Sequence, residues 1–301
     1  MTLHQNEIHS DEALVGSLVR TQCPQWSDLP LSFAGAGTDN TMYRLGDELL
    51  VRLPRTADTA RSLRKEQEWL PRLAPHLTRR VPEPVHAGTP TGAFPLPWSV
   101  YRWIDGDVPG PGTVADWAAF GADLATAVRE FHGIDLMGAV RADDLSWYRG
   151  GDLSECDPWV GDRLDECRAL VGHELDVDAL AEMWRAARAL PASTAPHVWL
   201  HGDLKPTNLL VREGGLHAVI DFGCLSVGLP DAEHSTVWDL PPEARRAYWN
   251  ALDLDTATWS RARAWAIAVG VNGLTYYWHT YPAFVADCRA RLQAVLTTPT
   301  G

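Results

Sequence analysis

His201-Gly-Asp-Leu-Lys-Pro-Thr-Asn208, followed by Val219-Ile-Asp-Phe-Gly223, is the part of this 301-residue chain that decides its fold. Asp203 and Asn208 stand five residues apart on one expected loop. Two β-prone segments, separated by a Glu-Gly-Gly turn, predict a hairpin that folds Asp221 back beside that loop. Two carboxylates and an amide oxygen on a rigid base suit phosphoryl transfer from a nucleotide, which needs one group to orient the acceptor hydroxyl and hard oxygen ligands for Mg²⁺.

These two motifs resemble the catalytic and metal-binding motifs of the protein-kinase-like superfamily. The His-Gly-Asp form resembles the aminoglycoside phosphotransferases and their relatives. The resemblance implies Asp203 as catalytic base and Asn208 and Asp221 as Mg²⁺ ligands, with ATP or GTP as co-substrate. It also implies that His201 orients the loop and that Lys205 helps to neutralise the transferred phosphate. The alternative, a loop and hairpin with no catalytic role, is disfavoured because spacing, residue types and hairpin all agree.

The segment Ala34-Gly-Ala-Gly-Thr-Asp-Asn40 precedes a predicted strand and resembles the family's loop over the nucleotide phosphates. Small residues there would let backbone N–H groups approach an anion. The resemblance implies that the nucleotide is contacted by Gly35, Gly37, Thr38 and Asn40.

Arg52 stands in the next strand, where the family usually has a lysine that reaches the α- and β-phosphates. Arginine can bind phosphate through its planar fork, although the two residues are not interchangeable. Glu66, on the helix predicted to follow, is the best-placed partner for Arg52. Glu68 is the alternative, and both could equally be surface charges.

The run Trp98–Ile104 resembles the strand that leads into the interlobe hinge, where backbone groups bind the purine. Tyr101 and Trp103 would then line or neighbour the nucleotide pocket. A buried structural role for these aromatic side chains is equally open.

The rest of the chain predicts an α+β, two-lobed, protein-kinase-like fold. Residues 1–104 would form a β-rich nucleotide-binding lobe, with strands at 41–45 and 49–53 and a helix at 59–73. Residues 105–301 would form a mainly helical lobe that carries the catalytic loop and the substrate site. Its predicted helices lie at 114–131, 177–190 and 259–277. A site would lie in the cleft between the lobes.

One departure from the resemblance follows the second motif. Relatives commonly have Gly-Asp-Pro at this place, whereas this chain has Gly228-Leu-Pro-Asp231. A loop near the site is therefore expected to be organised differently, and no role is assigned to Asp231.

The distribution of charge bears on the partners. The net charge is −13, which argues against nucleic acid because there is no basic surface to neutralise phosphates. Residues 105–190 hold 18 acidic and 7 basic residues and so carry most of the excess. The acidic side chains of this segment either form a solvated surface or create an electrostatic field that attracts a cationic substrate.

Carboxylates and aromatic side chains alternate between residues 143 and 166. Such a mixture suits an aminated sugar, through ion pairs and stacking, so we expect a small cationic acceptor, most of all an aminoglycoside-like antibiotic. A macrolide is the next candidate. The alternatives are a housekeeping kinase of choline, a hydroxy amino acid or an amino sugar, and a nucleotide-binding pseudokinase.

The N-terminal residues lack the basic and apolar regions of a secretory signal. The longest nearly apolar stretch, Ala264–Leu274, is too short to span a bilayer. Five scattered cysteines fit reduced thiols better than a disulfide framework. We therefore expect a cytoplasmic enzyme with no membrane partner.

Overall fold

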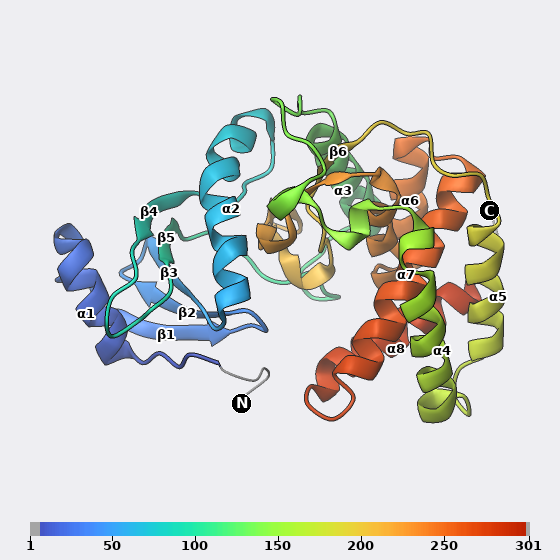
Figure 1. Ribbon diagram of the computed structural model, residues 1–301. Coiled ribbons are helices and arrows are strands. Elements are labelled where there is room, and N and C mark those ends of the chain that lie inside the picture. The colour runs from blue at the N-terminus through green and yellow to red at the C-terminus, as the bar shows by residue number, and fades with distance from the viewer. Residues whose placement is uncertain (1–6, 299–301) are drawn as a thin grey trace.

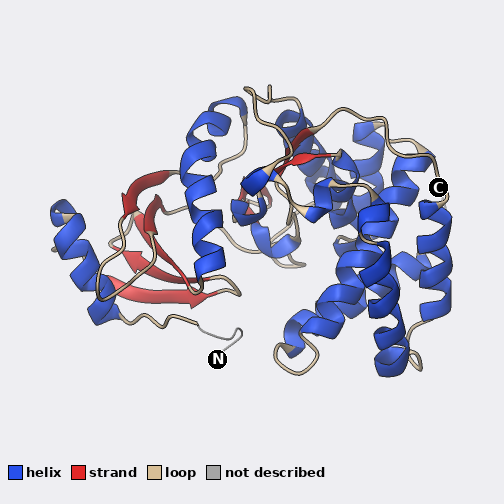
Figure 2. Ribbon diagram, viewed as in Figure 1, coloured by secondary structure: helices blue, strands red, loops and turns tan. Residues whose placement is uncertain are grey.

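The computed structural model describes residues 7–298. Strands gather at the N-terminal side and helices at the C-terminal side, as Figures 1 and 2 show. The strands are β1 (Leu31–Ala36), β2 (Asn40–Leu45), β3 (Leu49–Pro54), β4 (Pro84–Gly88), β5 (Trp98–Arg102), β6 (Val198–Leu200), β7 (Leu209–Arg212), β8 (Gly215–Val219) and β9 (Ser226–Gly228). The α-helices are α1 (Glu12–Gln22), α2 (Ala57–Leu73), α3 (Trp117–His132), α4 (Asp157–Val171), α5 (Val177–Arg188), α6 (Pro242–Leu252), α7 (Thr256–Tyr276) and α8 (Pro282–Thr297).

The N-terminal part is built on an antiparallel sheet with the strand order β1-β2-β3-β5-β4. The two strands predicted around the Gly46-Asp47 turn are confirmed as β2 and β3, which pair from Leu45↔Leu49 onward. Gly46 has a φ of 58°, a conformation that favours glycine and closes the turn tightly. The strand predicted at 98–104 is also present and ends at Arg102.

Helices pack against this sheet from two sides. The predicted helix at 59–73 is confirmed as α2, which lies between the sheet and the helical part of the molecule in Figure 1. Helix α1 was not predicted; it starts at the N-cap Asp11 and buries Val15, Leu18 and Val19 in the core of the sheet. Strand β4 was not predicted either. Its first residue, Pro84, reads as a break in the sequence but is tolerated at the edge of a sheet.

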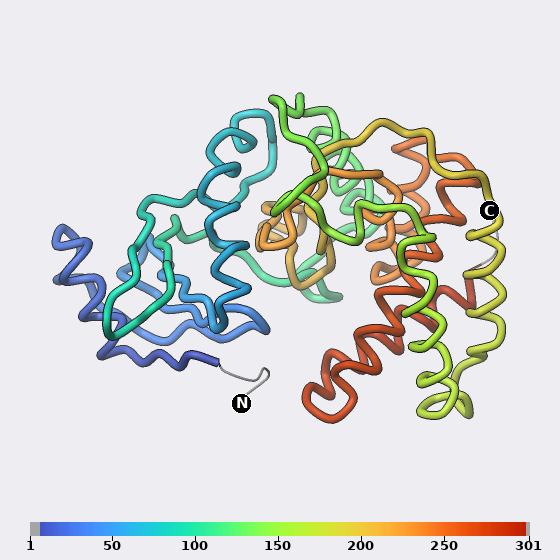
Figure 3. The backbone as a smooth tube through the Cα atoms, in the orientation of Figure 1, coloured from blue at the N-terminus to red at the C-terminus, as the bar shows by residue number. Residues whose placement is uncertain are grey.

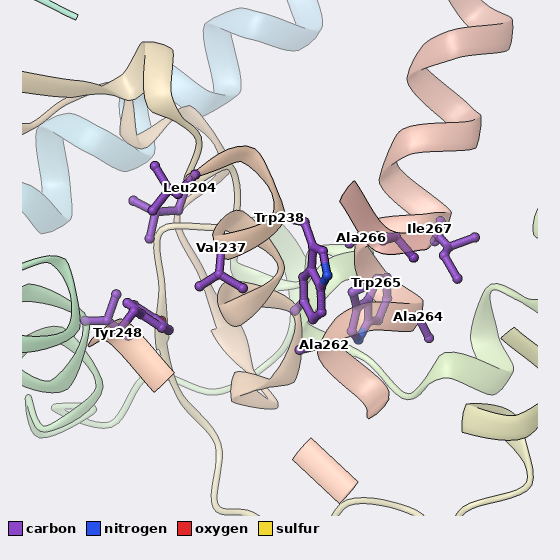
Figure 4. Close-up of a cluster of buried hydrophobic side chains, with 14 of the residues drawn as sticks. Leu204, Val237, Trp238, Tyr248, Ala262, Ala264, Trp265, Ala266 and Ile267 are labelled. Atoms are coloured by element: carbon purple, nitrogen blue, oxygen red, sulfur yellow. The ribbon is translucent and has the colours of Figure 1, made fainter. Parts of the chain in front are cut away.

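The helical part confirms the three helices expected there, as α3, α5 and α7. Helix α3 starts three residues later than predicted because Asp116 caps it by accepting from Ala118 N at 2.8 Å. Helices α4, α6 and α8 were not predicted. Figure 4 shows part of the core of this lobe, which includes Trp238, Trp265 and, from the predicted catalytic loop, Leu204. The loop is therefore anchored in the core of the helical lobe.

A small β island carries the two sequence motifs. Strands β7 and β8 form the predicted hairpin, and its turn residues Glu213 and Gly214 both have positive φ, as a primed two-residue turn requires. Strand β6, which leads into the catalytic loop, pairs with β9. Short 3₁₀ helices join these strands to their surroundings: η4 (Tyr148–Gly150), η6 (Pro206–Asn208), η7 (Phe222–Cys224) and η8 (Pro230–Asp239).

The predicted linker can be followed in the tube of Figure 3, from β5 to α3. It is tied to the β island, because Asp107 and Val211 exchange two backbone hydrogen bonds, of 3.0 and 2.7 Å. The predicted α+β, two-lobed organisation is thus confirmed, while a domain boundary at 104/105 stays a prediction. Within residues 7–298, no helix is long and apolar enough to cross a membrane.

Candidate active site

The predicted catalytic loop, residues 201–208, is held in place at Gly202, by the Glu233 carboxylate and by the His201 ring. Gly202 has a φ of 80°, and a Cβ there would lie 2.3 Å from the carbonyl oxygen of Cys224, so only glycine fits. The carboxylate of Glu233, on η8, accepts from His201 N at 2.5 Å and from Gly202 N at 3.4 Å. The His201 ring contacts the Ile220 carbonyl oxygen through Nε2 at 2.9 Å. His201 therefore connects the loop to the end of the hairpin, as expected of an orienting residue.

Asp203, the predicted base, is held between two cations. Its Oδ1 lies 2.6 Å from Arg149 Nη1, and its Oδ2 lies 2.8 Å from Lys205 Nζ. Burial would raise the pKa of Asp203, but the charges and hydrogen bonds of Arg149 and Lys205 outweigh it and hold the pKa well below its usual range. The carboxylate is thus ionised and oriented, which suits a group that positions an acceptor hydroxyl.

Asn208 and Asp221, the predicted metal ligands, are brought together by the hairpin. Ile220 N donates to Asn208 O at 2.9 Å, so Asp221 follows directly after a residue bonded to Asn208. Asn208 Nδ2 donates to Asp203 O at 2.9 Å, an arrangement that leaves the amide Oδ1 available as a ligand. Asp221 has left-handed backbone geometry (φ 64°, ψ 66°), and its side chain is 45% exposed.

This donor set fits Mg²⁺. A carboxylate and an amide carbonyl are hard oxygen ligands, and Mg²⁺ at nucleotide sites takes one or two protein ligands and completes its shell with phosphates and water. In the part of the chain that the structure describes, no group of three or more His, Cys, Asp or Glu side chains could hold a metal by itself. Asn208 and Asp221 would therefore hold the ion together with the nucleotide.

Arg52 joins the two lobes at the site. It donates to both carboxylate oxygens of Glu66, at 3.0 and 2.8 Å, and to Asp221 Oδ1 at 2.5 Å. Burial alone would lower the pKa of Arg52, but the charges of Glu66 and Asp221 raise it, so the guanidinium stays charged. Glu66 is thereby the partner of Arg52, and the alternative Glu68 instead lies 3.9 Å from Arg72 on the exposed side of α2.

Asn40 and Tyr101 complete the surroundings of Arg52. With its amide oxygen turned to Arg52, Asn40 accepts from Nε at 3.1 Å and from Nη2 at 2.9 Å. Tyr101 is 2% exposed and donates to Glu66 Oε2 at 2.8 Å. Both side chains therefore support the Arg52–Glu66 pair, and their contact with a nucleotide stays a prediction.

The remaining predicted nucleotide contacts lie on the β1–β2 turn and after β5. Gly37 N donates to Asn40 O at 2.9 Å, which closes the turn that carries Thr38, while Gly35 lies just before it in β1, opposite Met42. Gly35 has a φ of 148°, which favours glycine. Trp103 donates its indole N–H to Asp105 at 2.5 Å, and the Arg44 guanidinium lies 3.9 Å from the centre of its ring. Trp103 is thus held by its own neighbours, and its role toward the purine is untested.

Two residues of the site, Arg149 and Glu233, were not predicted from the sequence. Arg149 and Glu233 reach the catalytic loop from 54 and 32 residues away, and neither belongs to a recognisable motif. Asp231, left without a role, is buried and pairs with Arg261 at 2.9 Å, so it fixes η8 onto α7. The displaced aspartate therefore has a structural contact in the element that carries Glu233.

Aromatic side chains of the segment from α7 to α8 lie beside Lys205. The Lys205 ammonium is 5.5 Å from the ring centre of Phe284, on which Tyr281 stacks at 6.0 Å. Burial raises the pKa of Tyr277 to about 12, and the negative charges of Asp39 and Asp203 add to the shift. Tyr277 thus lies within electrostatic range of both the β1–β2 turn and the catalytic loop.

The acidic side chains of residues 143–166 are largely paired with arginines. The pairs are Asp152–Arg188, Glu155–Arg141, Asp157–Arg188, Asp165–Arg168 and Glu166–Arg163. Asp143, Asp144 and Asp162 make no ion pair within residues 7–298. Only part of the negative charge of this segment is thus available for a substrate.

Comparison with known structures defines the class of the fold. Aminoglycoside 2′-phosphotransferase-IIIa in its GDP complex aligns with a TM-score of 0.78, over 95% of this chain and 98% of that chain, at 18% identity. The GDP and kanamycin complex of APH(2″)-IIIa aligns with a TM-score of 0.75, over 94% and 98%, at 19% identity. The macrolide 2′-phosphotransferase MphH of Brachybacterium faecium aligns with a TM-score of 0.60, over 97% and 100%, at 21% identity. The chain therefore has the kinase-like fold of these enzymes.

A model of the phosphotransferase enzyme family matches residues 30–265, which include both motifs and most of each lobe. The chain belongs to this family of small-molecule O-phosphotransferases. A search of curated proteins finds no match.

Proposed function

We propose that this enzyme moves the γ-phosphate of ATP or GTP to a hydroxyl group of a small cationic molecule, with an aminoglycoside-like antibiotic as the first candidate. The observation that carries the proposal is the placement of Asp203, Asn208 and Asp221 on one rigid β island, with Arg52 bound to Asp221 from the other lobe. Phosphoryl transfer is catalysed mainly by positioning and electrostatics, and this arrangement supplies both.

Each residue then has a role in the transfer. Asp203 accepts a hydrogen bond from the acceptor hydroxyl and directs its oxygen in line with the γ-phosphorus. A new P–O bond forms to that oxygen as the bond between the γ-phosphorus and the bridging oxygen breaks. Arg149 and Lys205 keep Asp203 ionised, so it can accept this hydrogen bond and take up the hydroxyl proton. Mg²⁺, when bound at Asn208 and Asp221, would neutralise charge on the phosphates.

Lys205 and Arg52 both bring positive charge to the proposed site, Lys205 beside Asp203 and Arg52 beside Asp221. Lys205 is 25% exposed and is held by Asp203, so it can also meet an oxygen of the γ-phosphate. Arg52 replaces the lysine usual in the family, and all three of its guanidinium nitrogens already have protein partners. Arg52 would therefore orient the proposed metal ligand Asp221. Any contact of Arg52 with phosphate would share a nitrogen with one of these protein partners.

The proposed acceptor class rests on the charge of the chain and on the aromatic side chains near Lys205. The net charge of −13 and the three unpaired acids of residues 143–166 favour a cationic acceptor. The aromatic side chains at Tyr277, Tyr281 and Phe284 favour an acceptor with an apolar face. For this reason a macrolide, which combines a single amine with a large apolar ring, is the second candidate.

The test is phosphate transfer from ATP and from GTP to a panel of aminoglycosides, macrolides and amino alcohols. Asp203→Ala is the control, because it removes the base and leaves the proposed metal ligands in place. Transfer to one class of compound, lost in the variant, would support the enzyme and name its acceptor. Tight Mg²⁺-nucleotide binding without transfer to any member of the panel would contradict both candidate acceptors.

A further inference from the structure

Arg149 contacts the catalytic loop from a separate part of the chain. Its Nη1 donates to Asp203 Oδ1 at 2.6 Å and to the Gly202 carbonyl oxygen at 2.9 Å. Its Nε donates to the hydroxyl of Tyr148 at 2.9 Å. The side chain is only 18% exposed, so these bonds are made largely out of water. Arg149 therefore holds both the side chain and the preceding peptide of the predicted base.

The position of Arg149 is set by a close packing of two glycines. A Cβ on Gly228 would lie 2.3 Å from the Gly150 carbonyl oxygen, and Leu229 N donates to that oxygen at 2.9 Å. The segment η4 is thereby fixed to the end of β9. Strand β9 pairs with β6, which runs directly into the catalytic loop. One small sheet thus positions the arginine and the carboxylate that it binds.

The two oxygens of Asp203 are held in different ways. Lys205, two residues along the same loop, binds Oδ2 at 2.8 Å and moves whenever the loop moves. Arg149 binds Oδ1 from a segment outside the loop, so it restrains the carboxylate relative to the helical lobe. The Gly202 peptide is restrained on its other side, because its N–H donates to Glu233. Loss of Arg149 would leave the carboxylate free to rotate with Lys205.

We propose that Arg149 is a positioning residue. It fixes the carboxylate of Asp203 so that this carboxylate can orient the acceptor hydroxyl toward the γ-phosphorus. The proposal rests on the phosphotransfer function given above. Arg149 acts through Asp203, so its loss reduces the rate of the chemical step and spares the binding of the nucleotide.

The test compares three variants of the full chain. Arg149→Met removes the positive charge and all the hydrogen-bond donors of the guanidinium. Arg149→Lys keeps a positive charge and donors on a single nitrogen. Arg141→Met is the matched control. Arg141 lies in the same connection between α3 and α4 and has a side chain 22% exposed, but it pairs with Glu155 at 2.8 Å and not with Asp203.

The first readout is the kinetics of Mg²⁺-ATP and Mg²⁺-GTP hydrolysis, and of transfer to any acceptor that the panel identifies. We expect kcat to fall about 100-fold in Arg149→Met, because a misplaced reacting group costs a factor of that order. The nucleotide KM should stay within about twofold, Arg149→Lys should recover part of kcat, and Arg141→Met should match the wild type. A kcat within about threefold of wild type in Arg149→Met would overturn the proposal.

The second readout needs no turnover and so separates this proposal from the choice of acceptor. Hydrogen exchange is measured on the amides of residues 200–208 in each variant. We expect exchange there to become about tenfold faster in Arg149→Met and to stay unchanged elsewhere and in Arg141→Met. Unchanged exchange in the loop, or faster exchange spread over the whole molecule, would show that Arg149 does not position the loop. If the wild type turns over no nucleotide, the proposed function fails while this readout still decides the role of Arg149.

Discussion

Arg52 and Asp221 are 169 residues apart in the sequence, yet Nη2 of the arginine lies 2.5 Å from Oδ1 of the aspartate. The same guanidinium binds Glu66 with its other terminal nitrogen. One side chain therefore connects β3, α2 and the residue that follows β8. The arginine makes the two contacts from two separate terminal nitrogens, whereas a lysine would have to make both from one. The arginine thus joins the N-terminal sheet to a proposed metal ligand of the helical lobe.

Replacement of Arg52 should destabilise the protein strongly. Glu66 is fully buried and would lose its ion partner in Arg52→Met. Removal of one member of a buried ion pair costs about 3–5 kcal/mol, which urea denaturation would measure. Arg52→Lys should cost less, because a charge remains beside Glu66.

Arg102→Met is the control for the Arg52 variants. Arg102 is 52% exposed and lies 3.5 Å from Glu48, so its loss should change the free energy of unfolding by less than about 1 kcal/mol. Equal effects of the two Met substitutions would contradict the buried role of Arg52.

Substitution of Asp221 should change the metal dependence of the enzyme. Asp221→Ala removes one of two proposed protein ligands, so a higher Mg²⁺ concentration should be needed for half-maximal nucleotide binding. A titration of nucleotide affinity against Mg²⁺ measures the change. The same Mg²⁺ requirement in wild type and variant would exclude Asp221 as a ligand.

Asp203→Asn should reduce kcat without a comparable loss of nucleotide affinity. The amide cannot accept a proton, and positioned acid–base groups contribute about 10²–10⁴-fold to the rate. Steady-state kinetics with the accepted substrate, together with nucleotide binding by calorimetry, separate the two effects. A variant with normal kcat would assign catalysis to another residue.

Glu233 should make stability fall as the pH rises. Burial raises its pKa to about 7, against its ordinary value of 4.5, although the amides of His201 and Gly202 oppose the shift. Between these values the folded protein keeps a proton that the unfolded chain has lost, so the free energy of unfolding decreases with pH. The change amounts to roughly 3 kcal/mol across the window.

The pH dependence is tested by comparison with Glu233→Gln, which cannot titrate. The difference in unfolding free energy between wild type and variant should favour the wild type most below pH 4.5 and least above pH 7. Denaturant melts at several pH values give this difference. If this difference in unfolding free energy does not vary with pH, the pKa of Glu233 is not raised by burial and the prediction is wrong.

The parts of the site that are local in the sequence were predictable. Asp203, Asn208 and the turn at 213–214 lie within a few residues of one another, and their types and spacing indicate the loop and the hairpin. Glu66 was also predicted as the partner of Arg52, since the spacing of a strand and the following helix restricts which acids can reach it. The helices that escaped prediction, such as α4, owe their place to packing on α7 and not to local signals alone.

Local patterns of residues therefore define the catalytic loop, the strands and turns around it, and the family to which the chain belongs. They act over short distances, where the backbone conformation depends on neighbouring side chains. The contacts of Arg149 with Asp203, of Glu233 with His201 and of Arg52 with Asp221 arise only when distant segments pack together. Such contacts depend on the relative placement of whole strands and helices, which is set by burial of the apolar core and is not encoded at any single position.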